Sequence, residues 1–518
     1  MFNKSLNIIL LPYFQKFTPE ILLLFCILLL IIYKYLFKER FNYLYSIFFL
    51  VYSLVILSIV IYLLIQMLFS DSICNKDTDL FIINSKVCVA KIVIIAISII
   101  CLLFFRYSLT NSQTNCLGYF ILYLSTILIC LMALSINFSN LAFTFLSLEL
   151  VITCFYILSS FNFNNFGYLL FRFIHVRKLL YFSSLLSLIG LLIFYGHYQL
   201  ENLALINDFK NLNYFLSILL VHKQYLLISS IVFLLLSLIL KMVIFHSPTH
   251  YIYYQKTPII TIMFMHLTPK ILFFYLIIEL IFTNYYFSIC KHYINLVLLI
   301  SSIICLIISI GMRRLFLKHY IEYISLVNSG YLLLCLSPLT STSLNYSIYF
   351  LLYYILILLF YGSIFSFFDN IENPGKRISF DTIFFEIEKK DYLSIILSIF
   401  LFFLLGLPPT RRDYPCSRGI PFNGFLLQWL VLNSLLDGQL YWISFFLIIF
   451  NLILFLFFFW TIVPFWYENK KFISSVLPKY LTSELIEYIF LYLIFFLLIL
   501  QVDINFLIIN YIKTLHIL

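Results

Sequence analysis

Three ionisable residues inside long apolar runs have the clearest chemical potential in this sequence. Glu149, Lys241 and Lys270 are surrounded mainly by Leu, Ile, Phe and Val, and an ionisable group at the centre of a bilayer costs about 2.5–3.5 kcal/mol on insertion scales. Desolvation favours the neutral form of a lysine, whereas a nearby carboxylate favours its charged form. Movement of Glu149 relative to Lys241 would therefore switch the affinity of that lysine for a proton, and Lys270 is the natural receiver.

A structural alternative exists for each of these residues. Glu149 and Lys241 could be a purely structural ion pair, and a lysine near a membrane surface can extend its charged head into water. Lys270 lies near the middle of its apolar run, where such an extension is difficult. His266 precedes it by four residues, on the same helical face, and could extend the relay or form a helix–helix hydrogen bond. Lys91, near the start of its run, is expected to extend to the surface.

A second carboxylate, Glu279, lies near the end of the run that contains Lys270. Its position favours the membrane interface, so we assign it no role in the relay from the sequence. The relay hypothesis therefore depends on how the apolar runs cross the membrane.

The composition places these residues in a helical membrane protein. Of 518 residues, 64% are hydrophobic and 10% are charged, whereas soluble domains carry about 25% charged residues. The period-2 alternation of a membrane barrel is missing, and apolar runs of helical length recur throughout. Since a span needs about 20 apolar residues, we expect about fourteen, at 19–37, 43–69, 87–105, 117–137, 139–161, 177–197, 224–246, 258–283, 292–311, 321–338, 345–368, 392–436 (interrupted), 440–466 and 484–510.

The charge distribution agrees with this count. Most Lys and Arg residues outside the runs follow odd-numbered spans, as expected when basic loops gather on one side of a membrane. The net charge of +10 thus reflects membrane orientation rather than nucleic-acid binding. The 11 cysteines show no metal-type spacing, so we expect no metal site and no disulfide framework.

Amino-acid usage bears on the origin of the chain. Phe (60) and Tyr (40) are abundant and Gly (12) is scarce, a bias typical of A/T-rich codons and organelle genomes. Residues 1–19 lack the Arg/Ser-rich amphipathic pattern of a transit peptide. Both features favour an organelle-encoded protein.

Several stretches, in a fixed order, carry a resemblance to one family. They are an L-x-L-E-L setting within 133–158, the pieces 182–186 and 195–196, the lysine segment 268–274, the segment 318–334, a Pro/Gly break at 406–409 with 424–425, and 438–442. Together they resemble the antiporter-like membrane subunits of respiratory complex I, specifically the NADH dehydrogenase subunit 2 family. We treat 1–518 as a single membrane domain, with N-terminal helices at 1–110, an antiporter-like core at 115–470 and a C-terminal helix at 471–518.

The resemblance implies an all-α, polytopic membrane helical bundle with inverted five-helix repeats and broken seventh and twelfth spans. It implies a multi-pass, proton-translocating, non-redox subunit of NADH:ubiquinone reductase in the mitochondrial inner membrane. Protons would pass Glu149, Lys241 and Lys270, with an exit near Gln428. Such a subunit binds no NADH, flavin, iron–sulfur cluster or quinone itself. Its partners are other membrane-arm subunits and the lipid bilayer, and nucleic acid is not among them.

The sequence departs from the family pattern in four places. Gln428 stands where the family has a lysine, and a glutamine holds no extra proton; Asn328 replaces an expected histidine. The stretch after Lys241 is about one helical turn short. Residues 410–421 form an insertion in the twelfth-span break that contains three arginines, Arg411, Arg412 and Arg418. With this insertion, either 406–409 or 419–421 could be the break motif.

Two other functions fit the same residues. An Mrp-type cation/proton antiporter subunit shares the helix plan and the Glu–Lys–Lys set, and stable membership of a redox complex would separate it from the first interpretation. An unrelated multispanning transporter would carry its buried charges for structural reasons. In that case, replacing Lys270 with Met would leave proton flux unchanged.

Overall fold

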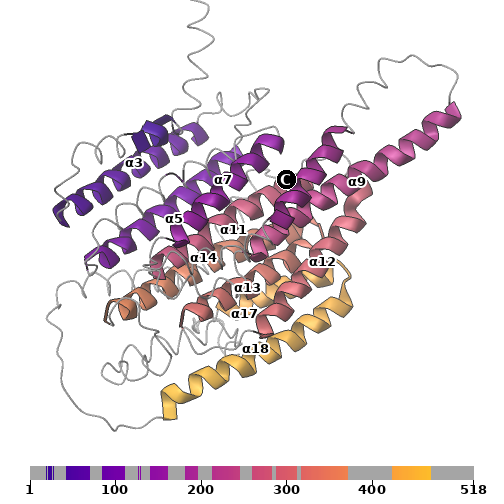
Figure 1. The fold of residues 1–518 in the computed structure, drawn as a ribbon. Helices are drawn as coiled ribbons and strands as arrows, with labels where there is room; N and C mark the ends of the chain where they lie inside the picture. The colour runs from indigo at the N-terminus through magenta and orange to yellow at the C-terminus, as the bar shows by residue number, and fades with distance from the viewer. Residues whose placement is uncertain are drawn as a thin grey trace, which may run out of the picture. The chain divides into compact units, whose positions relative to one another are not determined.

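The computed structural model is helical throughout the part of the chain that it describes (Figure 1). The described residues are 19, 21–25, 27–28, 43–69, 85–110, 127, 129, 141–160, 181–196, 213–244, 259–282, 287–311, 317–371 and 423–467. Within these ranges there is no β-strand. The all-α prediction is therefore confirmed for this part of the chain.

Contacts between residues divide the chain into two compact units, Met1–Cys290 and Lys291–Leu518. The helices of the first unit are α3 (Tyr43–Phe69), α5 (Ser85–Thr110), α7 (Leu141–Ser160), the helix Tyr181–Gly196, α9 (Asn213–Ile244) and α11 (Ile259–Phe282). Helix α11 packs against α5, α7 and α9, and α5 also packs against α3 (Figure 1). Almost every described side chain of α11 is buried or half-buried, so α11 is the central helix of this unit.

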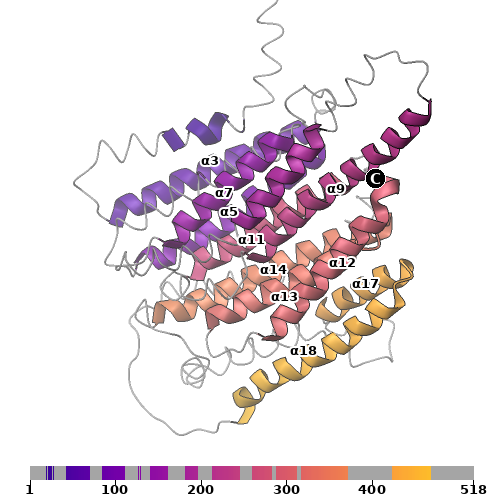
Figure 2. The ribbon, with the colours of Figure 1, turned by 45° about the vertical axis from the view of Figure 1, so that its right-hand side comes forward.

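The helices of the second unit are α12 (Phe287–Gly311), which begins at the boundary, α13 (Leu317–Leu336), α14 (Ser341–Ile371), α17 (Asn423–Asp437) and α18 (Tyr441–Tyr467). Helices α13, α14 and α17 pack against one another, and α17 also packs against α18, as Figure 2 shows from a second direction. Helix α12 approaches α13 closely at Gly330, where an added Cβ would lie 2.8 Å from the Cδ2 atom of Leu306.

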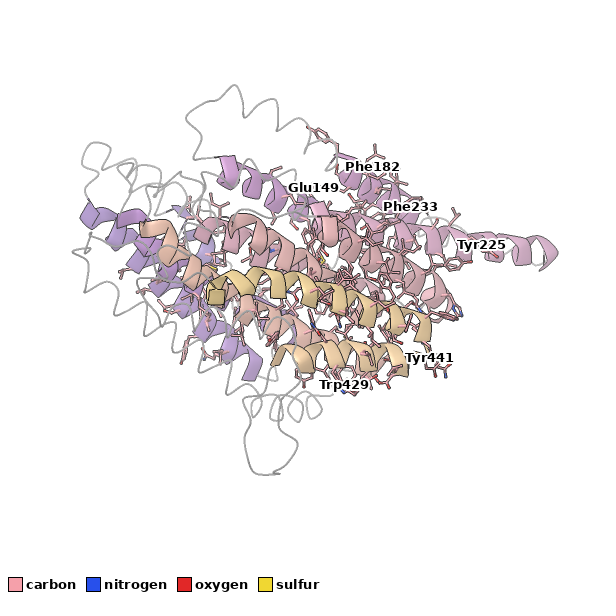
Figure 3. The ribbon with its side chains drawn as sticks, turned by 90° about the horizontal axis from the view of Figure 1, so that it is seen from below. Glu149, Phe182, Tyr225, Phe233, Trp429 and Tyr441 are labelled. Carbon is pink, nitrogen blue, oxygen red and sulfur yellow. The ribbon has the colours of Figure 1, made fainter. Side chains whose placement is uncertain are left out.

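The outward faces of the helices are strongly apolar. Phe182, Tyr225, Trp429 and Tyr441, labelled in Figure 3, are all exposed in the isolated chain. Large apolar side chains exposed at this density require a lipid or protein covering. By length and composition alone, two segments among the described residues are long and apolar enough to cross a membrane: Lys291–Ser309 and Ser341–Leu359. Seven shorter apolar segments, of 10–17 residues each, lie within other described helices.

The expected spans agree with the described helices. Every expected span that falls within the described ranges coincides with a helix, although α9 begins eleven residues before the predicted start (213 against 224). The spans expected at 19–37, 117–137 and 484–510 lie wholly or largely outside the described residues, so the count of about fourteen stays a prediction. Helix α9 contains most of the seventh expected span, for which the family resemblance implied a break. It is one continuous helix from Asn213 to Ile244, so the implied break does not lie within these residues. The break expected in the twelfth span lies outside the described residues, as do the inserted arginines.

Candidate functional site

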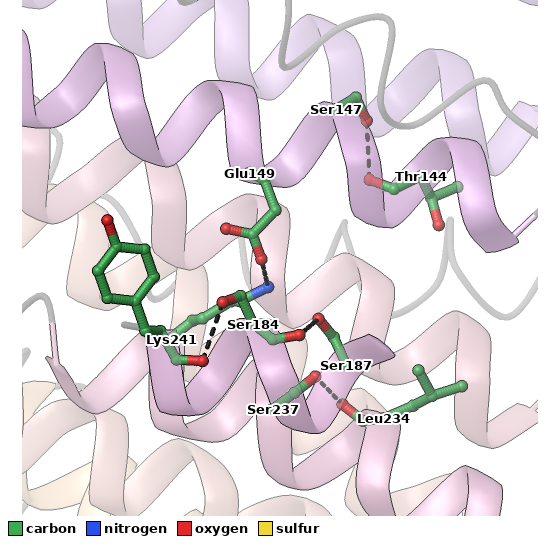
Figure 4. A network of polar contacts seen from close by, with 9 residues as sticks. Thr144, Ser147, Glu149, Ser184, Ser187, Leu234, Ser237 and Lys241 are labelled. Atoms are coloured by element: carbon green, nitrogen blue, oxygen red, sulfur yellow. Dashed lines mark hydrogen bonds and ion pairs between the residues drawn. The ribbon is translucent and has the colours of Figure 1, made fainter. Parts of the chain in front are cut away.

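The structure places Glu149 and Lys241 in direct contact. The ammonium Nζ of Lys241, on α9, donates a hydrogen bond to Oε1 of Glu149, on α7, at 2.5 Å (Figure 4). The two residues are 92 positions apart in the chain, so only the packing of two helices brings them together. A contact between an ammonium and a carboxylate is a charge-assisted hydrogen bond, which is shorter and stronger than a neutral one.

The two halves of this pair have different environments. The side chain of Lys241 is 0% exposed, whereas that of Glu149 is 37% exposed. The Lys241 ammonium also lies 5.6 Å from the centroid of the Phe145 ring, which precedes Glu149 by one helical turn. A cation over a ring face gains further stabilisation when water is excluded. The charged lysine is thus held by one carboxylate and one aromatic ring, and the carboxylate is the half that reaches the surface of the described structure.

The helices that carry the pair also carry buried hydroxyl groups. Thr144 and Ser147 lie on α7 but on a different face from Glu149, and Ser237 lies one turn before Lys241 on α9 (Figure 4). Each hydroxyl donates to a carbonyl oxygen of its own helix, at 2.7–2.8 Å. A hydroxyl oxygen that donates one bond still has lone pairs that can accept another from water or an ammonium group.

A further row of hydroxyls comes from the helix Tyr181–Gly196. This helix packs tightly on α9, because a Cβ added to Gly190 would lie 2.9 Å from Cγ of Leu234. Ser187 and Ser183 precede Gly190 by three and seven residues, which puts them on the same face, and both are buried. Figure 4 shows Ser187 close to Ser237 on α9, in the neighbourhood of Lys241.

Lys270 and His266 are buried on the central helix α11, which packs against both α7 and α9. Pro269 lies inside this helix, directly before Lys270. A proline has no N–H, so the carbonyl four residues earlier loses its helical hydrogen bond. The adjacent Thr268 hydroxyl donates to the carbonyl of Phe264 at 2.7 Å, one turn before it. Lys270 therefore lies where the backbone of α11 is least constrained by its own hydrogen bonds.

Comparison with known proteins gives a consistent fold. A chain of respiratory complex I from Thermus thermophilus superposes with a TM-score of 0.64, at 13% identity, over 94% of this chain and 98% of that one. A chain of the membrane-bound sulfane sulfur reductase, an archaeal respiratory membrane complex, gives 0.68 at 14% identity, over 97% and 96%. A chain of the Mrp complex from Dietzia sp. DQ12-45-1b gives 0.62 at 13% identity, over 90% and 81%.

The chain has the fold of antiporter-like membrane subunits. The prediction of a polytopic membrane helical bundle is thereby confirmed. In sequence, the chain is similar to NADH-quinone oxidoreductase subunit N of Wolbachia sp. subsp. Brugia malayi (strain TRS), at 25% identity over 306 residues. The similarity spans 58% of this chain and 60% of that relative. No family model matches the chain.

Of the other residues singled out in the sequence, Gln428 and Asn328 lie in the second unit, and Lys91 is buried rather than exposed. Gln428 is half-buried on α17 and Asn328 half-buried on α13, both in the second unit. The prediction that Lys91 extends to the membrane surface is wrong. Its side chain on α5 is 3% exposed, so its ammonium group does not reach water. Position along the span suggested an exit to the surface, but α5 is covered by α3 on one side and α11 on another.

Sequence reasoning did not select Phe145 or the buried serines of the helix Tyr181–Gly196. Phe145 looks like an ordinary apolar span residue, and its one distinguishing feature is a spacing of four residues from Glu149. Ser183 and Ser187 carry the same spacing, which places both hydroxyls on one face.

Proposed function

We propose that this chain is a proton-translocating, antiporter-like subunit in the membrane arm of mitochondrial complex I. One observation carries the proposal: a lysine with no exposed surface is paired with a carboxylate at 2.5 Å inside a fold shared with chains of a respiratory complex I and of an Mrp complex. The similarity to a subunit of a NADH-quinone oxidoreductase favours the respiratory assignment. The codon-biased composition favours a mitochondrial origin.

The proposed mechanism uses separation of the Glu149–Lys241 pair as the switch. At an effective dielectric constant of about 20, two unit charges about 4 Å apart attract by about 4 kcal/mol, equivalent to about a thousandfold in proton affinity. In the contact seen here, the carboxylate keeps the ammonium charged. When the two separate, the buried lysine loses that support and passes its proton toward Lys270 on α11.

Lys270 then holds the proton until it leaves on the opposite side. His266, one turn away on α11, is a candidate intermediate station, and Gln428 is a candidate exit residue that orders water rather than binding a proton. Redox chemistry takes place in neighbouring subunits, so this chain holds no cofactor and its partners are the other membrane-arm subunits and the lipid bilayer. Energy reaches the relay as a change in the distance between α7 and α9.

Native electrophoresis tests the assignment to the complex. Inner membranes are solubilised mildly, the gel is stained for NADH oxidation, and the stained band is sequenced by mass spectrometry. We expect peptides of this chain in the active band. Their confinement to other bands would overturn the proposal.

An Mrp-type cation/proton antiporter subunit is the second candidate, because a chain of an Mrp complex shares the fold over 90% of this chain. In that case the same pair would exchange a proton for a second cation, with no redox partner. Stable association with an NADH-oxidising complex distinguishes the two functions.

A further inference from the structure

Two charged side chains of the first unit have no role in the relay described above. Lys91, on α5, is 3% exposed, and Glu279, on α11, is half-buried. Each makes a polar, ring or electrostatic contact in the structure. Because removing a charge from water without compensation is expensive, a lysine this well buried requires a partner of opposite charge or several acceptors.

Helices α5 and α11 pack side by side, which limits where that partner can be. The side chain of Tyr275, on α11, lies within electrostatic range of the Cys88 thiol on α5. It also hydrogen-bonds to the side chain of Glu279, one turn further along α11. Cys88 thus marks the level of α5 that faces Tyr275 and Glu279.

Lys91 follows Cys88 by three residues, so both lie on the same face of α5. The two helices correspond to the third and eighth expected spans, which cross the membrane in opposite directions. Side chains in a helix lean toward its N-terminus. In an antiparallel pair, the Lys91 side chain therefore leans back toward the level of Cys88, and the Glu279 side chain leans back toward the level of Tyr275. Because Cys88 and Tyr275 lie at the same level, the two charged groups converge there.

We propose that Lys91 and Glu279 form a second buried acid–base pair, between α5 and α11, and that both are positioning residues for Lys270. Pro269 breaks the hydrogen-bond ladder of α11 directly before Lys270. The segment of α11 after the proline therefore needs an external constraint to hold its register. The pair with Lys91 supplies that constraint about nine residues beyond Lys270, a distance of about 13 Å along the helix axis.

This inference rests on the proposed function, since Lys270 is the residue being positioned. The test measures protons moved per NADH oxidised in sealed membranes, with rates normalised to the amount of assembled complex. Lys91→Met and Glu279→Gln should each lower this ratio by about twofold or more, because each leaves one charge of the pair uncompensated and weakens the constraint on α11. The double variant should recover much of the loss, since removal of both charges leaves none uncompensated. Lys91→Arg, which keeps the charge, should stay close to wild type.

Lys291→Met and Asp437→Asn are matched controls, because both side chains are exposed on helices or helix ends. They should leave the ratio unchanged. Additive losses in the double variant, or single variants that behave as the controls do, would overturn the inference. Glu149→Gln is measured in parallel: if it lowers the ratio while the Lys91 and Glu279 variants do not, this inference alone fails. If Glu149→Gln pumps as wild type, the proposed function fails. The contact between Lys91 and Glu279 is then still tested by the thermal stability of the solubilised complex, where the losses of the two single variants should not add in the double variant.

Discussion

At the residue scale, the unequal exposure of Glu149 and Lys241 determines what their substitution does. Removal of Glu149 leaves a lysine with no exposed surface and no carboxylate to keep its ammonium charged, whereas removal of Lys241 leaves a carboxylate that still reaches the outside of the described structure. Breaking a fully buried pair from one side typically costs about 3–5 kcal/mol, and the partial exposure of Glu149 lowers the cost for this pair. The two single substitutions are therefore not equivalent, although they remove the same contact.

We expect Glu149→Gln to lower coupled proton pumping at least tenfold, since a change of about 1.4 kcal/mol in a barrier is already tenfold in rate. The glutamine keeps the size of the side chain and one acceptor oxygen but loses the charge that holds the ammonium. Pumping is followed as quenching of a pH-sensitive dye in sealed membranes, and NADH oxidation is measured with an uncoupler to confirm intact electron transfer. Wild-type pumping in the variant would refute the relay.

Lys270→Met should stop proton transfer beyond Lys241 while leaving the Glu149–Lys241 contact in place. Methionine fills a similar volume and carries no proton, so we expect the same loss of pumping, at least about tenfold. Lys291→Met removes an exposed lysine and serves as the control. Equal pumping in the two variants would assign the buried charge of Lys270 to structure alone.

The sequence predicted the buried ionisable residues because a charge within an apolar run is conspicuous in any span. It paired Glu149 with Lys241, but it did not predict the other groups around that pair. Phe145 is one aromatic residue among many. Ser183 and Ser187 are equally inconspicuous, because a serine hydroxyl can donate to a carbonyl of its own helix and is therefore tolerated at almost any helical position. Lys91 was assigned wrongly, because the linear position of a lysine does not say which neighbouring helix covers its face.

At the element scale, the helix ends in the second unit are built from local hydrogen bonds. After α17, Gln439 adopts a positive φ of 59°, its N–H donates to the carbonyl of Leu436, and the N–H of Leu440 donates to that of Leu435. This pattern is a Schellman motif, which usually has glycine at the position of positive φ. Before α14, Thr340 and Ser343 exchange side-chain and backbone hydrogen bonds in the manner of a capping box.

Gly438→Ala should destabilise the α17–α18 turn. A Cβ at this position would lie 2.6 Å from Cβ of Pro338, in the turn between α13 and α14, so one of the two turns must shift. Overpacking of this kind typically costs about 1–3 kcal/mol. We expect a lower midpoint in a thermal aggregation assay of the solubilised protein. Gly196→Ala is the control, because nothing lies within 4 Å of its added Cβ. Equal midpoints for the two variants would contradict this packing.

Helix positions were predictable because membrane spans have a minimum length and an apolar composition, which a single sequence displays directly. Helix ends were less predictable: α9 extends eleven residues before the expected start, through a segment that includes His222 and Lys223. Outside the hydrocarbon region, polar residues are compatible both with helix and with loop, so they do not show where a helix begins. The Glu149–Lys241 contact depends on which helices are neighbours, and that information is not contained in the apolar pattern.

At the scale of the whole molecule, the chemistry of the pair decides which ion the proposed relay would carry. A sodium site needs several oxygen ligands, as hard cations do in general. Here a carboxylate oxygen of Glu149 already accepts from the Lys241 ammonium, and a lysine can offer a cation nothing but repulsion. The same ammonium gains and loses a proton without needing any additional ligand. In the proposed relay, the pair is therefore suited to protons and, while it stays in contact, unsuited to sodium.

We accordingly expect NADH-driven acidification by the intact complex in sealed membranes to be unchanged when sodium is replaced by potassium or choline at constant ionic strength. Constant ionic strength is required because screening alone alters interactions between exposed charges. Glu149→Gln, measured in the same series, should pump poorly in all three salts. A rate that rises with sodium concentration and saturates would instead indicate exchange of a proton for sodium, the behaviour of the Mrp-type alternative. Because Lys241 occupies the carboxylate, sodium could then bind only after the pair had separated, and Lys241→Met would raise the apparent affinity for sodium rather than abolish it.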